Sequence, residues 1–448
     1  MNPVSRRRLL AGGAVAGTSA AVPQILQTAR ADAPSAPPPA TTPTVVVGGP
    51  ANAQWITPSN DPTGVLDTPV IQAGLTSGSG VWLAPGDFYI NTTLTFAANN
   101  TVLYGQGRRA SRIHVAPGFT GAHAVDLGGH QFCEVRDLSI EAPAGTLGTS
   151  TQLNGIHLGG GGIRNRIAGV YFLNLNGWGF TFDSTTANCA GLVLEDLVAD
   201  TCAGAISLRG PASPAYHGSA AIIAPSAVNM GTGSGPLAGA PAFAFTDFED
   251  VTFFAHPATT PRNGGGAIVI TGDCAALFFY GADMGGTPNS PAVVIQDDGT
   301  ASPTAISFHG GFLQLASIGA QIIGSASKIL FEGVHFQHNQ THGLSIENAG
   351  PVTATGHDVL VSRCFFAANG NGATGTDYDL NWAGGSTGDV LGCHFGSTIV
   401  NPVIPPQAPG VRFSVNNATA NVRYELNTFP ATSDNYTADP PSHVLPTP

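Results

Sequence analysis

Residues 132–140 read Phe-Cys-Glu-Val-Arg-Asp-Leu-Ser-Ile, with apolar side chains at alternate positions on both sides of Asp137. Alternation with a period of two is typical of short β-strands that bury one face. Asp is also one of the residues that best tolerates the left-handed backbone conformation of a tight corner. The segment therefore predicts two short strands that meet at a corner.

The same pattern recurs along the chain, in residues 191–199, 245–253, 305–313, 328–336, 359–366 and 390–395. The corner position is held by Asp137, Gly169, Asp196, Asp250, Gly281, Gly311, Gly333, Arg363 and Gly392. With one exception, these corners are 22–32 residues apart, which is the length of one coil of three short strands. A repeat of this length, in a chain with 59 Gly and only 10% charged residues, predicts an all-β, right-handed parallel β-helix.

The exception is the interval of 54 residues between Asp196 and Asp250. It contains a stretch rich in Pro, Ala and Gly, which are typical of loops. We therefore expect residues 209–241 to be a loop insertion that projects from one side of the helix.

The N-terminus predicts export. Arg6-Arg7-Arg8 precede an uncharged Ala/Gly-rich stretch, and residues 29–31 read Ala-Arg-Ala, a small-x-small cleavage site. Residues 1–31 thus indicate a twin-arginine-type signal peptide and a secreted or periplasmic protein, with a membrane anchor as the alternative. Residues 32–50 are expected to be a flexible Pro/Thr-rich linker, residues 51–430 the β-helix domain and residues 431–448 a C-terminal tail.

The charge of the chain limits its partners. The net charge is −12, and it becomes roughly −16 once the four Arg of the signal are removed, which disfavours nucleic acid and, after signal cleavage, membrane surfaces. None of the six Cys forms a Cys-x-x-Cys pair, so no zinc site is expected. Folding in a reducing compartment before export favours buried free thiols, with a bridge formed after export as the alternative.

The N-terminal part of the expected domain adds a second signal. Residues 67–75 read Asp-Thr-Pro-Val-Ile-Gln-Ala-Gly-Leu, and they are followed by Val81-Trp-Leu-Ala-Pro-Gly-Asp-Phe-Tyr-Ile90 and Val102-Leu-Tyr-Gly-Gln-Gly107. This order resembles the N-terminal segment of the pectin-lyase-like superfamily, especially pectate-lyase- and polygalacturonase-related proteins. The resemblance implies a right-handed β-helix with a short N-terminal capping helix. Of the polygalacturonase catalytic motifs, only Asp297-Asp298 has a counterpart here.

In such helices the resemblance places the binding cleft on the strand after the longest loop. Each coil has one such strand. When these strands are aligned by their inward residues, His157 and Asn381 fall in one outward column, and Asp183, Arg209 and Glu347 fall in the next. We expect these five residues to bind substrate.

Three carboxylates follow these strands and are the predicted catalytic residues. Asp273 and Asp298 fall in neighbouring coils, with Asp297 beside them, and stacked carboxylates would lie about 5 Å apart. At this distance one carboxyl group can act as the acid and the other as the nucleophile. If the two groups lie slightly further apart, a water molecule fits between them. The alternative is that these Asp residues form turns, since Gly272-Asp273 and Asp298-Gly299 are ordinary turn dipeptides, or that they hold Ca²⁺.

These features favour an exported enzyme that cleaves the glycosidic bonds of a polysaccharide or oligosaccharide, as a hydrolase or transglycosidase without a cofactor. A lyase acting on a uronate polymer is the first alternative, and a non-catalytic glycan-binding β-helix is the second. The chain is expected to be a monomer or a homotrimer. A local group of His335, His338 and His342 favours hydrogen bonding over a metal site.

Overall fold

The computed structural model describes residues 40–47, 54–78, 80–143, 152–187, 189–211, 218–230, 239–255, 260–261, 266–286, 288–347, 359–370, 378–382, 387–395, 413–415, 421–428 and 436–438. The predicted signal peptide and its cleavage site therefore lie outside the described residues. No helix in the described part is long and apolar enough to cross a bilayer.

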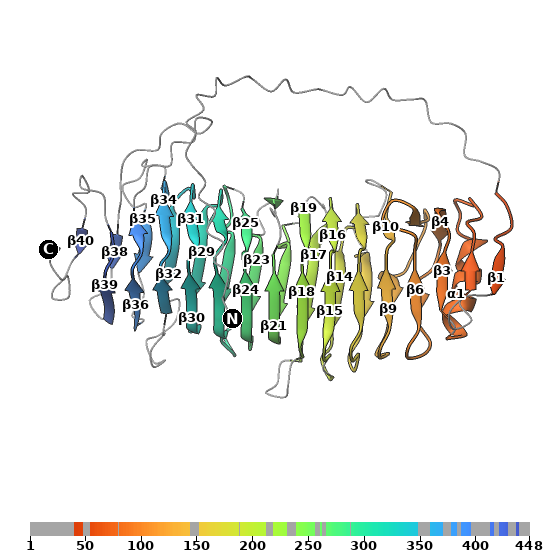
Figure 1. The fold of residues 1–448 in the computed structure, drawn as a ribbon, viewed down its shortest axis with the longest axis horizontal. Coiled ribbons are helices and arrows are strands. Elements are labelled where there is room, and N and C mark those ends of the chain that lie inside the picture. Colours follow the sequence, from red (N-terminus) through yellow and green to blue (C-terminus); the bar gives the residue numbers. More distant parts are fainter. Residues whose placement is uncertain are drawn as a thin grey trace, which may run out of the picture. The chain divides into compact units, whose positions relative to one another are not determined.

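The described strands form four sheets, and from β3 to β39 every third strand returns to the same side of the coil (Figure 1). Sheet A consists of β1 (Val45–Val47), β2 (Gln54–Ile56), β3 (Val81–Leu83), β6 (Val102–Tyr104), β9 (Glu134–Arg136), β12 (Arg166–Ala168), β15 (Leu192–Glu195), β18 (Ala220–Ile223), β21 (Glu249–Phe254), β24 (Ala275–Tyr280), β27 (Thr304–His309), β30 (Ser327–Glu332), β33 (Val359–Ser362), β36 (Thr387–Leu391) and β39 (Asn421–Glu425). Sheet C consists of β5 (Leu94–Thr95), β8 (His123–Asp126), β11 (Asn154–Leu158), β14 (Trp178–Asp183), β17 (Gly204–Arg209), β20 (Phe243–Thr246), β23 (Ile268–Thr271), β26 (Val293–Gln296), β29 (Ile318–Ile323), β32 (His342–Glu347), β35 (Tyr378–Trp382), β38 (Phe413–Val415) and β40 (Tyr436–Ala438).

The third side of the coil is divided between two smaller sheets. Sheet B consists of β4 (Gly86–Ile90), β7 (Ser111–Val115), β10 (Ser139–Glu141), β13 (Tyr171–Leu173), β16 (Val198–Asp200), β19 (Ser226–Met230) and β22 (Thr260–Pro261). Sheet D continues it with β25 (Asp283–Gly285), β28 (Phe312–Gln314), β31 (His335–Gln337), β34 (Phe365–Ala367) and β37 (His394–Phe395). From β2 onward the described pairs within the sheets are parallel, so the predicted all-β parallel β-helix is confirmed.

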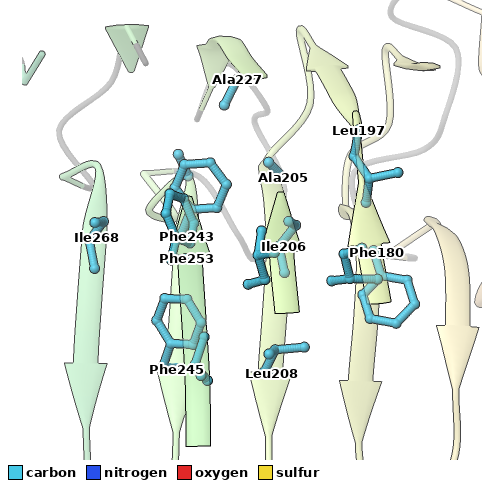
Figure 2. Packing of buried hydrophobic residues seen from close by; sticks show 14 of the residues in the cluster. Phe180, Leu197, Ala205, Ile206, Leu208, Ala227, Phe243, Phe245, Phe253 and Ile268 are labelled. Atoms are coloured by element: carbon cyan, nitrogen blue, oxygen red, sulfur yellow. The ribbon is translucent and has the colours of Figure 1, made fainter. Parts of the chain in front are cut away.

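The core follows from the alternation that the sequence shows. Inward residues of all three sides are fully buried, and outward residues alternate with them. Phe243 on β20 and Phe253 on β21 come from different sheets and meet edge to face, with ring centroids 5.1 Å apart (Figure 2). The interior of each coil is therefore filled by side chains from opposite sides.

The corner residues adopt the backbone conformation that the sequence predicts. Positive φ angles occur at Asp137 (58°), Gly169 (62°), Asp196 (52°), Asp250 (53°), Gly281 (65°), Gly311 (87°), Gly333 (65°), Arg363 (52°) and Gly392 (61°). Asp250 is nevertheless not at the same corner as the others. Its neighbours Glu249 and Val251 pair with Ala275 and Leu277, so Asp250 lies near the start of a sheet A strand.

The predicted loop insertion at residues 209–241 is wrong for a large part of this segment. It contains β18 and β19, which pair in register with β15 and β16 and complete a coil. The corner between them is at Ala224, with φ of 50°, and the sequence pattern is missed there because Ala is not a typical corner residue. The interval of 54 residues therefore holds an additional coil.

Both ends of the predicted domain extend further than the sequence indicates. β1 lies within the expected linker 32–50, where it pairs antiparallel with β2, and β40 lies within the expected tail 431–448. The helix α1 (Asp67–Thr76) occupies the predicted position, and it buries Ile71 and Leu75. The Asp67 carboxylate accepts hydrogen bonds from the backbone N–H of Ser59 (2.9 Å) and of Tyr89 (3.0 Å), which ties the helix to β4. Its role as the cap of the stack stays a prediction.

All six cysteines are buried free thiols, as the reducing-compartment argument predicts. Burial raises the pKa of Cys189, Cys202 and Cys274 to about 12, so these thiols are unreactive at neutral pH.

A repeated Asp–Gly arrangement joins neighbouring coils where sheet C turns into sheet A. Asp247 Oδ1 accepts a hydrogen bond from the N–H of Asp273 at 2.8 Å, and Asp297 Oδ2 accepts one from the N–H of Ser325 at 2.9 Å. In each case the residue before the donor is a glycine with positive φ, Gly272 or Gly324. The carboxylate occupies the space that a side chain at the glycine would fill.

Replacement of Gly324 by Ala should therefore lower the free energy of unfolding by about 3 kcal/mol. The new Cβ would lie 2.0 Å from Asp297 Oδ2, at a φ of +79°. About 1–2 kcal/mol comes from the backbone conformation and about 1–3 kcal/mol from the displaced hydrogen bond. Gly299→Ala is the matched control in urea titrations, because φ is +85° and nothing lies within 4 Å of its Cβ. Equal losses in both variants would contradict a supporting role for the carboxylate.

Candidate functional site

The outward face of sheet C carries the two columns that the sequence predicts. The first column runs in register through His157, Thr181, Ser207, Ala244, Val269, Val294, Gln321, Ser345 and Asn381. The second runs through Asp183, Arg209, Thr246, Thr271, Gln296, Ile323 and Glu347. The five predicted substrate-binding residues therefore share one face, but they gather at the two ends of the columns, and a middle without charged residues separates them.

A hydrogen-bonded histidine group occupies the N-terminal end of this face. His157 Nδ1 lies 2.8 Å from Asp126 Oδ1, and the ring stacks on His123 with centroids 4.1 Å apart. Asp126 Oδ1 also accepts the N–H of Gly128 at 2.8 Å, which fixes the carboxylate. Asp126 thus holds the proton of His157 on Nδ1 and leaves Nε2 as an acceptor or base.

Neighbouring residues also set the state of His123. Asn154 Oδ1 accepts the backbone N–H of Trp178 at 2.8 Å, so Asn154 Nδ2 is the atom that faces His123 Nδ1, at 3.2 Å. Burial, with a further contribution from His157, lowers the pKa of His123 to about 4. His123 is therefore neutral near pH 7 and carries its proton on Nε2.

The adjacent positions combine buried and exposed polar groups. Thr181 follows His157 in the column and is only 6% exposed, and its Oγ1 has no hydrogen-bond partner among the described residues. Asp183 and Arg209 lie opposite each other in register, and both are exposed. The N-terminal end of the face thus offers acceptors, donors and both signs of charge within neighbouring coils.

A second polar group lies at the C-terminal end of the same face. The carboxylate of Glu347 accepts hydrogen bonds from Ser345 Oγ (2.7 Å) and Gln321 Nε2 (3.1 Å). Asn381 Nδ2 donates to Ser345 Oγ at 3.0 Å, whereas the buried Asn381 Oδ1 has no partner in the part of the chain that the structure describes. An unpaired buried acceptor is costly, and it is the kind of atom that a ligand hydroxyl satisfies.

The three predicted catalytic carboxylates lie where sheet C turns into sheet A, directly after β23 and β26. Asp298 Oδ1 accepts hydrogen bonds from Thr300 N (2.8 Å), Thr300 Oγ1 (2.7 Å) and Ala301 N (2.8 Å). Bonds from the Ala301 backbone and the Thr300 side chain lower the pKa of Asp298. Asp297 Oδ2 accepts the hydrogen bond from the Ser325 N–H that is described above. Both carboxylates therefore have a role in turns, and their catalytic role stays a prediction.

No group of three or more His, Cys, Asp or Glu side chains suited to a metal ion exists among the described residues. In the predicted histidine group, His335 stacks on Phe365 and His342 Nδ1 accepts the N–H of Tyr378 at 3.1 Å. The predicted hydrogen-bonding role is thus seen for His342, whereas His335 packs against an aromatic ring.

Sequence reasoning missed His123, Asp126 and Asn154. Residues 123–126 were not recognised as a sheet C strand, although Ala124, Val125 and Leu127 are apolar. Two features could have identified this strand. Val125 and Leu127 are apolar at alternate positions, and the strand begins about 30 residues, or one coil, before the next strand of the sheet at Asn154.

Fold and face together define a parallel β-helix protein with polar groups at both ends of one outward sheet face. No family model and no curated protein matches the chain. Solved structures do match it. The A-module of mannuronan C-5 epimerase AlgE4 from Azotobacter vinelandii is 14% identical, with 81% of this chain and 91% of that chain covered and a TM-score of 0.44.

Two further solved structures are similar at the same level. The catalytic domain of a GH87 α-1,3-glucanase is 12% identical, with 89% of this chain and 69% of that chain covered and a TM-score of 0.48. The enzymatically active domain of bacteriophage CBA120 tailspike protein 2 is 13% identical, with 82% and 51% covered and a TM-score of 0.44. At these TM-scores the matches carry no argument about the reaction of this chain, and the stacked parallel coils themselves establish the fold.

Proposed function

We propose that the outward face of sheet C binds a polysaccharide and that the protein cleaves it. The observation that carries this proposal is a pair of buried polar atoms in one outward column, Thr181 Oγ1 and Asn381 Oδ1, for which the described residues supply no hydrogen-bond partner. A polyhydroxylated chain supplies donors and acceptors along its length, and such atoms are costly unless a ligand pairs with them.

The separation of the two polar groups favours a long ligand. Eight strand spacings lie between His157 and Asn381, which is roughly 38 Å along the helix. One sugar cannot reach both groups, whereas a polymer laid along the coils can. The negative charge of the chain favours a neutral or mildly acidic glycan.

The first reaction class is hydrolysis or transglycosylation by a carboxylate pair. The lowered pKa of Asp298 fits the partner that stays ionised, as base or nucleophile, and leaves Asp273 as the acid. Asp297 would position the turn through its bond to Ser325.

A second reaction class, a lyase acting on a uronate polymer, is favoured by the Asp126–His157 hydrogen bond. His157 Nε2 would take the proton next to the uronate carboxylate, and Arg209 would bind that carboxylate. The carbon–oxygen bond to the leaving sugar then breaks, the pair of electrons left by the proton forms the double bond, and the leaving oxygen takes a proton from water.

Assay of a broad glycan panel separates the two classes. We expect new reducing ends with the full chain and a loss of at least about 10²-fold in an Asp273→Asn/Asp298→Asn double variant. Asp283→Asn on sheet D is the matched control for a carboxylate change away from this face. An unsaturated product that disappears in His157→Gln would assign the lyase instead. No product from any glycan, together with no binding, would refute the proposed function.

We further propose export to the periplasm or medium, with Ca²⁺ as the one ion to test and a monomer or homotrimer as the active form. Determination of the mature N-terminus tests cleavage after residue 31. Activity that is unchanged by a chelator would refute a need for Ca²⁺.

A further inference from the structure

A second constellation of reactive groups lies on another side of the helix, on the outward face of sheet A. Ser307 and His309 are two residues apart on β27, so their side chains point to the same face. His309 Nε2 lies 3.2 Å from Ser307 Oγ, and His309 Nδ1 lies 3.2 Å from Glu332 Oε2. Glu332 is the register partner of His309 on β30.

These contacts connect the atoms in the order that nucleophilic catalysis requires. The nitrogen that faces the hydroxyl can take its proton, and the carboxylate on the other nitrogen holds the ring in the tautomer needed for this transfer. The ring of His309 also stacks on Tyr280, with centroids 5.0 Å apart and planes 13° apart, which limits its rotation.

We infer that Ser307, His309 and Glu332 form a hydrolytic site for carboxylic esters. Ser307 is the nucleophile, His309 the general base and Glu332 the positioning residue. This site is independent of the glycan reaction proposed for sheet C, because it uses other residues on another sheet.

The reaction proceeds without any group beyond ester and water. His309 Nε2 takes the proton of Ser307 Oγ while Oγ bonds to the carbonyl carbon. The bond from that carbon to the alcohol oxygen then breaks, and the alcohol leaves with the proton from His309. A water molecule next gives a proton to His309 and its oxygen to the acyl carbon, which releases the acid and restores Ser307.

The surroundings favour esters with an apolar or aromatic group. Phe278 is the register partner of Ser307 and is 38% exposed, and Tyr280 (38%) and Phe254 (46%) continue the aromatic surface. Such rings can pack against an aryl or alkyl substituent, which removes apolar surface from water. Ser307 itself is only 6% exposed, so the scissile carbonyl has to approach between these side chains.

The test uses the full chain with two probes, a fluorophosphonate that labels activated serines and 4-nitrophenyl butyrate. We expect the fluorophosphonate on the peptide that contains Ser307, and ester hydrolysis that follows the labelling. Ser307→Ala should lower hydrolysis to the buffer rate, and His309→Asn should lower both labelling and hydrolysis by about 10²–10⁴-fold while Ser307 remains.

Glu332 is tested through the pH profile. Glu332→Gln should reduce the rate and shift the pH dependence of hydrolysis, and Glu332→Asp should restore part of both. Ser362→Ala, at the register partner of Glu332 on β33, is the control and should react like the parent chain. A folded parent chain that is not labelled at Ser307, or a His309→Asn variant that is labelled as fast as the parent, would overturn the inference.

Discussion

Replacement of Asp379 by Asn is expected to stabilise the protein at alkaline pH. The stability of the variant relative to the parent, measured as the difference between their free energies of unfolding, should increase by about 4 kcal/mol from pH 4 to pH 8. Asp379 lies on β35 and is 2% exposed. Its position follows from the register, in which Leu380 pairs with Leu344 and Asp379 therefore lies opposite Gly343.

The cause of this effect is burial. Burial raises the pKa of Asp379 to about 7 from 3.8, although Asn369 Nδ2 donates a hydrogen bond to its Oδ1 at 2.8 Å. Between these two pKa values the folded chain binds a proton that the unfolded chain has lost. The free energy of unfolding of the parent therefore falls as the pH rises from about 4 to 7, and it does not fall further above that range. Asn imitates the protonated carboxyl and has no such dependence.

Urea titrations at several pH values measure this difference. Tryptophan fluorescence follows the unfolding, and Trp382, which lies on the same strand and is fully buried, contributes to it together with the other three Trp of the chain. Asp183→Asn is the control, because this carboxylate lies on the same sheet and is exposed. A difference between the Asp379 variant and the parent that is constant from pH 4 to pH 8 would contradict an ionisation near 7.

The sequence contains most of the information on the fold because each coil repeats the same local signals. Alternating apolar residues and residues that tolerate positive φ, such as Asp137 and Gly392, mark nearly every coil. The coil through Ala224 escaped because its corner has no such residue and its neighbours are rich in Pro and Ala. A repeat is thus predictable only as far as its corners are chemically distinct.

Candidate sites are harder to predict because register brings together residues that are far apart in sequence. The columns through His157 and Asp183 were predictable once the strands were aligned by their inward residues. Ser307, His309 and Glu332 meet only because β27 and β30 pair without a shift, and no motif along the chain marks them. The hydrogen bonds that occupy Asp297 and Asp298 likewise depend on the next turn and the next coil.

Replacement of Phe308 by Ala is expected to lower the free energy of unfolding by about 3–5 kcal/mol. Phe308 is fully buried between two other rings, with centroids 4.5 Å from Phe279 and 5.3 Å from Phe331. The three residues come from successive strands of sheet A, so the cavity left by Ala would remove contacts on both sides at once. A coil contacts only its two neighbours, and little else can fill such a gap.

Urea titrations followed by circular dichroism measure this loss. Phe278→Ala is the matched control, because Phe278 precedes Phe279 on β24 and points outward with 38% of its surface exposed. We expect this control to lose less than about 1 kcal/mol, since the ring lies on the surface with 38% exposed and its removal leaves no closed cavity in the core. The loss of stability in Phe308→Leu should lie between those of Phe308→Ala and Phe278→Ala, because Leu fills part of the cavity but cannot stack on the neighbouring rings. If Phe308→Ala and Phe278→Ala destabilised the protein equally, the column of rings would not be what holds these coils together, and the packing of the sheets at their corners would have to supply that stability.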